Sequence, residues 1–159
     1  MIDELLSESY DRRIALVFLR HVGCVINFEI AQVVSKALDL DKSLRVICFF
    51  PGCENEIPTL KKIFSPSDRI SFVADPEKKF YDMFSIPRAS IRDFVVGSLK
   101  AIKYLPLLIK RLGKLIPSDP FQMPGLIIIE NGTISPYFGT DISDVSKLNQ
   151  FLCYQAAND

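Results

Sequence analysis

Residues 14–38 read IALVFLRHVGCVINFEIAQVVSKAL, and this stretch decides the fold. Its first part, residues 14–20, is almost entirely apolar and rich in β-formers, which is typical of a strand buried on both faces. The apolar residues after Cys24 recur at helical spacing, so the second part predicts a helix. Gly23 marks a tight turn between the two. The sequence therefore places a thiol at a strand-to-helix turn.

The rest of the chain continues an α/β pattern. An Asn131–Gly132 turn is expected to join two antiparallel strands, and the remaining segments alternate between strand and helix. Together they predict one mixed sheet with flanking helices. The expected strands are residues 44–50, 70–74, 125–130 and 133–138, and the expected helices are residues 54–64, 75–84 and about 144–155.

One segment stands out by its charge. From Arg88 to Lys114 there are seven basic residues and a single acid, Asp93, and the interleaved apolar residues predict one or two basic amphipathic helices. We expect a helical insertion over about residues 88–116. One interpretation is a lid over the thiol that attracts anionic substrates, lipid hydroperoxides or a membrane surface. We favour the other, a helix that buries its Leu and Ile face and keeps its cations in water.

Length and composition limit the classes of function. A chain of 159 residues fits a single domain, 1–159, and its zero net charge gives no broad attraction to nucleic acid. No apolar run reaches the roughly 18 residues that cross a bilayer, and the N-terminus lacks a signal-like stretch, so we expect a cytoplasmic protein without membrane contact. Four scattered cysteines and one histidine favour reduced thiols, with no metal or cofactor.

Several motifs together carry a family resemblance. They are RHVGC at 20–24, ADPEKKFYDMFSI at 74–86, the basic insertion, and DPFQMPGLIIIENGTI at 119–134. With these motifs nearly the whole chain resembles the peroxiredoxin-like branch of the alkyl hydroperoxide reductase and thiol-specific antioxidant superfamily. The resemblance implies a thioredoxin-like fold, with Cys24 as the first active-site cysteine and Pro124 as a cis-proline.

A cis Pro124 implies a second part of the site. In a thioredoxin-type domain the residue before this proline keeps its backbone N–H and C=O free to bind an extended substrate beside the cysteine. Met123 takes that position here. The alternative is that Pro124 ends a loop in the trans form.

The chain departs from the family pattern in two places. Members of the branch commonly have Cys-x-x-Cys, but Asn27 holds the second position, so no vicinal disulfide forms and Asn27 becomes a candidate substrate-binding residue. Ordinary peroxiredoxins also carry Pro-x-x-x-Thr-x-x-Cys. This chain has Val17 and His21 at the proline and threonine positions.

The position of Cys24 predicts a nucleophile. Free backbone N–H groups and the macrodipole at a helix start favour an anion, so a thiol there ionises more easily than in free solution. Arg20 and His21 are candidates for electrostatic support, although strand alternation lets at most one face the thiol. The alternative is that Cys24 packs as a small apolar residue.

The other cysteines divide by their position. Cys53 follows a strand expected beside the first, so both thiols would sit at one edge of the sheet, and Cys53 is a candidate resolving thiol for oxidised Cys24. It can equally be a helix-start residue without a redox role. We expect Cys48 and Cys153 to be core sulfurs.

These observations predict a thiol-dependent redox protein. The first hypothesis is a one-Cys peroxiredoxin-like peroxidase that reduces hydroperoxides through Cys24, with an external thiol of the glutathione or thioredoxin type as reductant. The alternatives are a monothiol-disulfide transferase and a non-catalytic thioredoxin-fold binding protein that uses the basic insertion. The superfamily resemblance also implies a homodimer.

Overall fold

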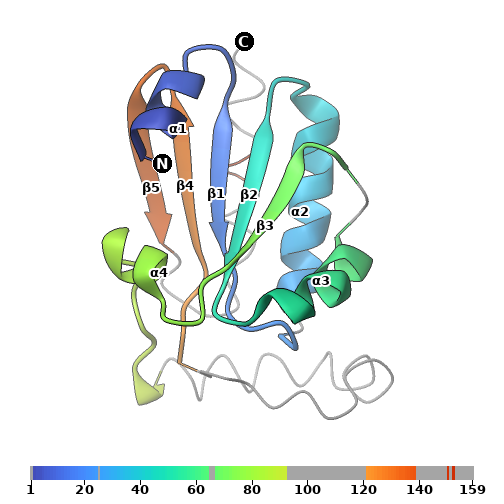
Figure 1. The fold of residues 1–159 in the computed structure, drawn as a ribbon, viewed down its shortest axis with the longest axis vertical. Helices are drawn as coiled ribbons and strands as arrows, with labels where there is room; N and C mark the ends of the chain where they lie inside the picture. Colours follow the sequence, from blue (N-terminus) through green and yellow to red (C-terminus); the bar gives the residue numbers. More distant parts are fainter. Residues whose placement is uncertain are drawn as a thin grey trace.

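A computed structural model describes residues 2–24, 26–64, 67–92 and 121–138, with residues 150 and 152. It contains one sheet with helices on both faces (Figure 1). The strands are β1 Ile14–Phe18, β2 Arg45–Phe50, β3 Ile70–Ala74, β4 Gly125–Glu130 and β5 Thr133–Phe138. The helices are α1 Ile2–Glu8, α2 Ile26–Leu40, the 3-10 turn η1 Glu54–Glu56, α3 Ile57–Ile63 and α4 Lys79–Met83.

The strand order is β3-β2-β1-β4-β5, with β1, β2 and β3 parallel and β4 antiparallel to both of its neighbours. The carboxyl ends of the three parallel strands therefore share one edge of the sheet, at the bottom of Figure 1. Phe18 pairs with Gly125, so the turn after β1 lies beside the residues that lead into β4. This edge, here called the carboxyl edge, carries Cys24.

Strand β1 is the centre of the core, and all five of its residues are buried. Alternate side chains serve opposite faces, because successive residues of a strand point to opposite sides. Ala15 and Val17 belong to the cluster that α2 and α3 cover. Leu16 and Phe18 belong to the cluster with residues of α1 and α4, where the Phe18 ring stacks on Phe49 at 4.9 Å. The predicted two-sided burial is confirmed.

The structure confirms the α/β mixed sheet and adds two local details. Helix α1 was not expected from the sequence. Helix α4 begins four residues after Asp75, yet the Asp75 carboxylate still caps it, accepting hydrogen bonds from the N–H groups of Lys79 at 2.9 Å and Phe80 at 2.8 Å.

Two expected elements fall largely outside the described residues. Of the basic insertion at about 88–116, the structure describes only residues 88–92, and of the helix at 144–155 only residues 150 and 152. Within the described part of the chain, no helix is long and apolar enough to cross a membrane.

Candidate functional site

Cys24 closes the turn between β1 and α2, as the sequence predicts. Its backbone N–H donates to the His21 carbonyl at 2.9 Å, and its own carbonyl accepts from the Asn27 N–H at 3.1 Å. These bonds carry the chain from the strand into the first turn of the helix. The residue is only 4% exposed. The thiol therefore stands at a helix start but beneath the surface.

Arg20 is the cation that faces the thiol. Its Nη1 donates to Cys24 Sγ at 3.5 Å, and its Nε donates to the Gln122 carbonyl at 2.8 Å. The side chain is buried together with Cys24. Since the guanidinium is planar and rigid, a fixed Nε also fixes the direction in which Nη1 points. His21 instead offers its backbone carbonyl to Cys24 and Asn27.

Asn27 ties the turn together from inside. Its Nδ2 donates to the His21 carbonyl at 2.8 Å and to the Val22 carbonyl at 3.5 Å, and the residue is fully buried. Its Oδ1 is buried and has no hydrogen-bond partner among the described residues. The side chain at the position of the missing second cysteine thus holds the loop that presents Cys24. Its substrate-binding role stays a prediction.

The direction of the Cys24 pKa shift differs from the expectation. Burial raises the pKa of the Cys24 thiol, while the Arg20 charge and hydrogen bond and the N–H groups of Ile26 and Asn27 lower it by less. The expectation of an easily ionised thiol is wrong for the structure described here, in which Cys24 is buried. The helix-start argument accounts for the N–H donors but leaves out the cost of removing a thiolate from water.

The expected cis peptide bond before Pro124 is corrected, whereas the substrate-binding role of Met123 stays a prediction. No peptide bond among the described residues is cis, so the bond before Pro124 is trans. The Met123 N–H donates to the Pro87 carbonyl at 3.3 Å, and the Met123 carbonyl accepts from Gln122 Nε2 at 3.4 Å. The physical reason is that residues 87–89 run antiparallel beside residues 121–123 and take the Met123 N–H, while the Gln122 side chain takes the Met123 carbonyl. Pro124 itself is buried beside the turn, at the start of β4.

Cys53 follows β2 at the carboxyl edge and is exposed. Its backbone N–H donates to Glu56 Oε2 at 2.8 Å, which fixes the start of η1. Cys24, Cys48 and Cys53 are all free thiols. The resolving role of Cys53 stays a prediction. Cys48 is a core sulfur as expected, and burial raises the pKa of its thiol; Cys153 lies outside the described residues.

Two residues that sequence reasoning did not single out hold the site in place. The Tyr81 hydroxyl on α4 donates to the Leu19 carbonyl and to the Phe49 carbonyl, at 3.0 Å for the latter, so it joins the ends of β1 and β2. Burial, then Asp75 and Cys48, raises the pKa of Tyr81 well above its ordinary value. Gln122 joins Arg20 to the approach to β4. Tyr81 and Gln122 both lie within the sequence motifs that carry the family resemblance. That resemblance was the only sequence signal that pointed to them.

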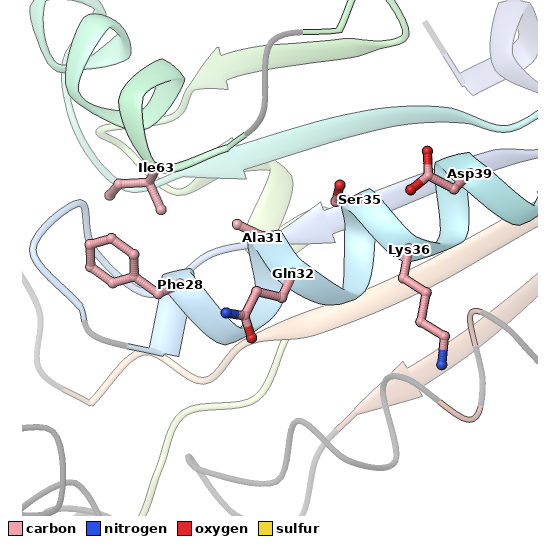
Figure 2. Close-up of a pocket in the computed structure, with 7 residues that line it drawn as sticks. All are labelled: Phe28, Ala31, Gln32, Ser35, Lys36, Asp39 and Ile63. Atoms are coloured by element: carbon pink, nitrogen blue, oxygen red, sulfur yellow. The ribbon is translucent and has the colours of Figure 1, made fainter.

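A separate pocket of about 400 Å³ lies on the outer side of α2 and reaches α3 (Figure 2). It is lined by Phe28, Ala31, Gln32, Ser35, Lys36, Asp39 and Ile63. None of the predicted site residues lines it, so it is distinct from the thiol site. No cluster of three or more His, Cys, Asp or Glu side chains suited to a metal exists in the described part of the chain.

Parallel β1, β2 and β3, the antiparallel β4 and β5, and a cysteine at the turn after β1 define a thioredoxin-like domain. Solved structures agree. A secreted Mycobacterium tuberculosis disulfide oxidoreductase homologous to E. coli DsbE matches with a TM-score of 0.56 and 8% identity, over 93% of this chain and 85% of that chain. MTB DsbF, solved in its mixed oxidized and reduced forms, matches with a TM-score of 0.51 and 11% identity, over 90% of this chain and 82% of that chain.

At these identities the likeness establishes the fold. No protein-family model matches the chain, and no curated protein matches its sequence. The resemblance to the peroxiredoxin-like branch is therefore not confirmed.

Proposed function

We propose that this protein is a thiol-disulfide oxidoreductase that works through Cys24 alone. The observation that carries the proposal is the 3.5 Å contact from Arg20 Nη1 to Cys24 Sγ, at the strand-to-helix turn of a thioredoxin-like domain. A cation that donates to sulfur stabilises the thiolate, which is the reactive form. The neighbour described as a disulfide oxidoreductase supports thiol-disulfide exchange over peroxide reduction.

The reaction has two exchange steps. The Cys24 thiolate attacks one sulfur of a disulfide RS–SR′, the bond Cys24–S–SR forms, and R′S⁻ leaves with the electron pair of the broken bond. Because Asn27 replaces the second cysteine of the turn, the mixed disulfide is released by an external thiolate R″S⁻. That step forms RS–SR″ and returns the Cys24 thiolate. The implied partner is an external thiol of the glutathione or thioredoxin type.

Burial sets a condition on this reaction. A disulfide sulfur has to reach Cys24 Sγ in line, and Cys24 is only 4% exposed. The turn at 21–24 therefore opens before attack. Opening also restores water to the sulfur, so the desolvation that raises the pKa of Cys24 is lost while a neighbouring guanidinium still favours the thiolate.

A one-Cys peroxidase is the second candidate, and the observation that favours it is the absence of a second cysteine in the turn. The Cys24 thiolate would attack ROOH to give Cys24–SOH and RO⁻, which takes a proton from water. An external thiol R′SH would then form Cys24–S–SR′ and water, and another thiol would release R′S from Cys24 as a disulfide.

The burial of Cys24 favours a third candidate, a thioredoxin-fold binding protein without turnover.

The test measures turnover of a small mixed disulfide of glutathione, with excess glutathione as the reductant. The rate at which oxidised glutathione forms is the readout. We expect activity in the parent chain, none in Cys24→Ser, and retention in Cys53→Ser, the matched control at an exposed thiol. Equal activity in the parent and Cys24→Ser refutes the proposal. Consumption of hydroperoxide without disulfide turnover would establish the peroxidase instead.

Cellular location and oligomeric state stay predictions. The expected cytoplasmic location is not supported by the neighbour that is described as secreted. A homodimer and a contact surface on the basic insertion likewise stay proposals.

A further inference from the structure

The backbone beside Cys24 is already paired within the chain. Residues 87–89, here called the strap, lie antiparallel to residues 121–123, with an isolated bridge between Arg88 and Gln122. The Ala89 N–H donates to the Phe121 carbonyl at 2.7 Å, and the Met123 N–H donates to the Pro87 carbonyl at 3.3 Å. The strap thus takes the position of an added β-strand on this segment.

Gln122 fastens the strap from within. Its side-chain Nε2 donates to the Pro87 carbonyl at 3.3 Å and to the Met123 carbonyl at 3.4 Å, and the residue is only 1% exposed. The N–H and the carbonyl of Met123 are therefore both engaged, one by the strap and one by Gln122. A substrate backbone that arrives here meets groups that already have partners.

On the side of residues 121–123 that faces away from the strap, the backbone is bonded by Arg20, the cation that contacts Cys24. The Gln122 carbonyl accepts from Arg20 Nε at 2.8 Å, and Arg20 Nη1 donates to Cys24 Sγ. A polypeptide that adds as a strand draws its affinity from main-chain hydrogen bonds to an exposed edge. Residues 121–123 hold the strap on one side and Arg20 on the other.

We propose that Cys24 exchanges with low-molecular-weight thiols and disulfides, and that extended polypeptides are excluded because the strap fills the place of the substrate strand. This inference rests on the proposed function and names its substrate class. A small disulfide needs only in-line access of one sulfur to Cys24 Sγ, so it requires opening of the turn but no backbone pairing. An extended peptide would also have to displace the strap, losing the three bonds that hold it.

The experiment compares mixed disulfides of 2-nitro-5-thiobenzoate with cysteine alone and with single-cysteine peptides of increasing length, to about nine residues. Release of the coloured thiolate gives the second-order rate constant. It is measured on the Cys53→Ser chain, and the rate of the chain that also carries Cys24→Ser is subtracted. We expect a rate constant that is level or falls with length. A rise of about tenfold or more, equal to about 1.4 kcal/mol, overturns the inference.

Failure of the proposed function gives a different result. In that case Cys24 reacts with no member of the series, including the mixed disulfide with cysteine alone. Both the proposed function and the substrate class are then refuted. Reaction at Cys24 that accelerates with peptide length leaves the proposed function standing and removes the substrate class alone.

A pair of strap variants tests the cause. Ala89→Pro removes the N–H that donates to Phe121, while Ala89→Gly keeps it. We expect the proline variant to accelerate with peptide length and the glycine variant to behave as the parent. Gln122→Met, which removes both side-chain donations at similar volume, should act in the same direction. If Ala89→Pro and Gln122→Met both fold and keep the parent's length dependence, the strap is not the cause of exclusion.

Discussion

Replacing Arg20 by methionine removes the cation at Cys24 while keeping most of the buried side-chain volume. At 3.5 Å and an effective dielectric constant of about 20, two unit charges attract by roughly 5 kcal/mol. The guanidinium spreads its charge over three nitrogens, so we expect Arg20 to stabilise the thiolate by less, about 1.4 to 4 kcal/mol. The apparent pKa of Cys24 therefore rises in Arg20→Met.

The assay is the rate of Cys24 alkylation across pH in the Cys53→Ser chain. Below both pKa values each 1.4 kcal/mol of lost stabilisation lowers the thiolate fraction about tenfold, so Arg20→Met should react about 10 to 1000 times more slowly near neutral pH. The two rates should converge once pH exceeds both pKa values. Arg45→Met is the control, because Arg45 pairs with Ile14 at the opposite end of β1. Superimposable pH profiles for Arg20→Met and its parent would refute the electrostatic role of Arg20.

Three further predictions concern stability. Asn27→Leu removes the amide that bonds the His21 and Val22 carbonyls, so the free energy of unfolding in urea should fall by about 1–3 kcal/mol and Cys24 alkylation should accelerate. Unchanged stability and an unchanged alkylation rate would contradict a structural role of this amide. Tyr81→Phe keeps the ring but removes the hydroxyl that two buried carbonyls share, and should cost about 1–2 kcal/mol, whereas Tyr10→Phe at an exposed ring should cost nothing. Burial raises the pKa of Cys24, Cys48 and Tyr81, so the folded state binds their protons more tightly than the unfolded state. The contribution of these three groups to stability should therefore be constant below the unfolded thiol pKa of about 8.5 and fall as pH rises above it. A free energy of unfolding that does not fall above that pH would contradict the raised pKa values.

The sequence was sufficient for the framework of the site because its signals are local. A continuous apolar run predicted β1 as a strand covered on both faces, and helical periodicity after Cys24 predicted α2. The helix expected at residues 75–84 was likewise found, although α4 begins later than expected, at Lys79. Each of these depends on residues within a few positions of one another.

What could not be predicted depends on contacts between distant segments. Cys24 is buried in the cluster that also holds residues of α2, β2 and β4, so the desolvation that raises its pKa leaves no mark in the RHVGC turn. The pairing of residues 87–89 with 121–123 joins segments more than thirty residues apart, and it uses the Met123 N–H that was expected to be free. The expected cis Pro124 came from family resemblance, and the peptide bond is trans.

The central claim is that Cys24, although buried, is the thiol that exchanges, while exposed Cys53 is not required. The most direct measurement is peptide mapping by mass spectrometry after the chain reacts with one equivalent of glutathione disulfide. The account predicts a glutathione adduct on Cys24, present in Cys53→Ser and absent from Cys24→Ser. An adduct confined to Cys53, with Cys24 unmodified in the Cys53→Ser chain, would contradict it.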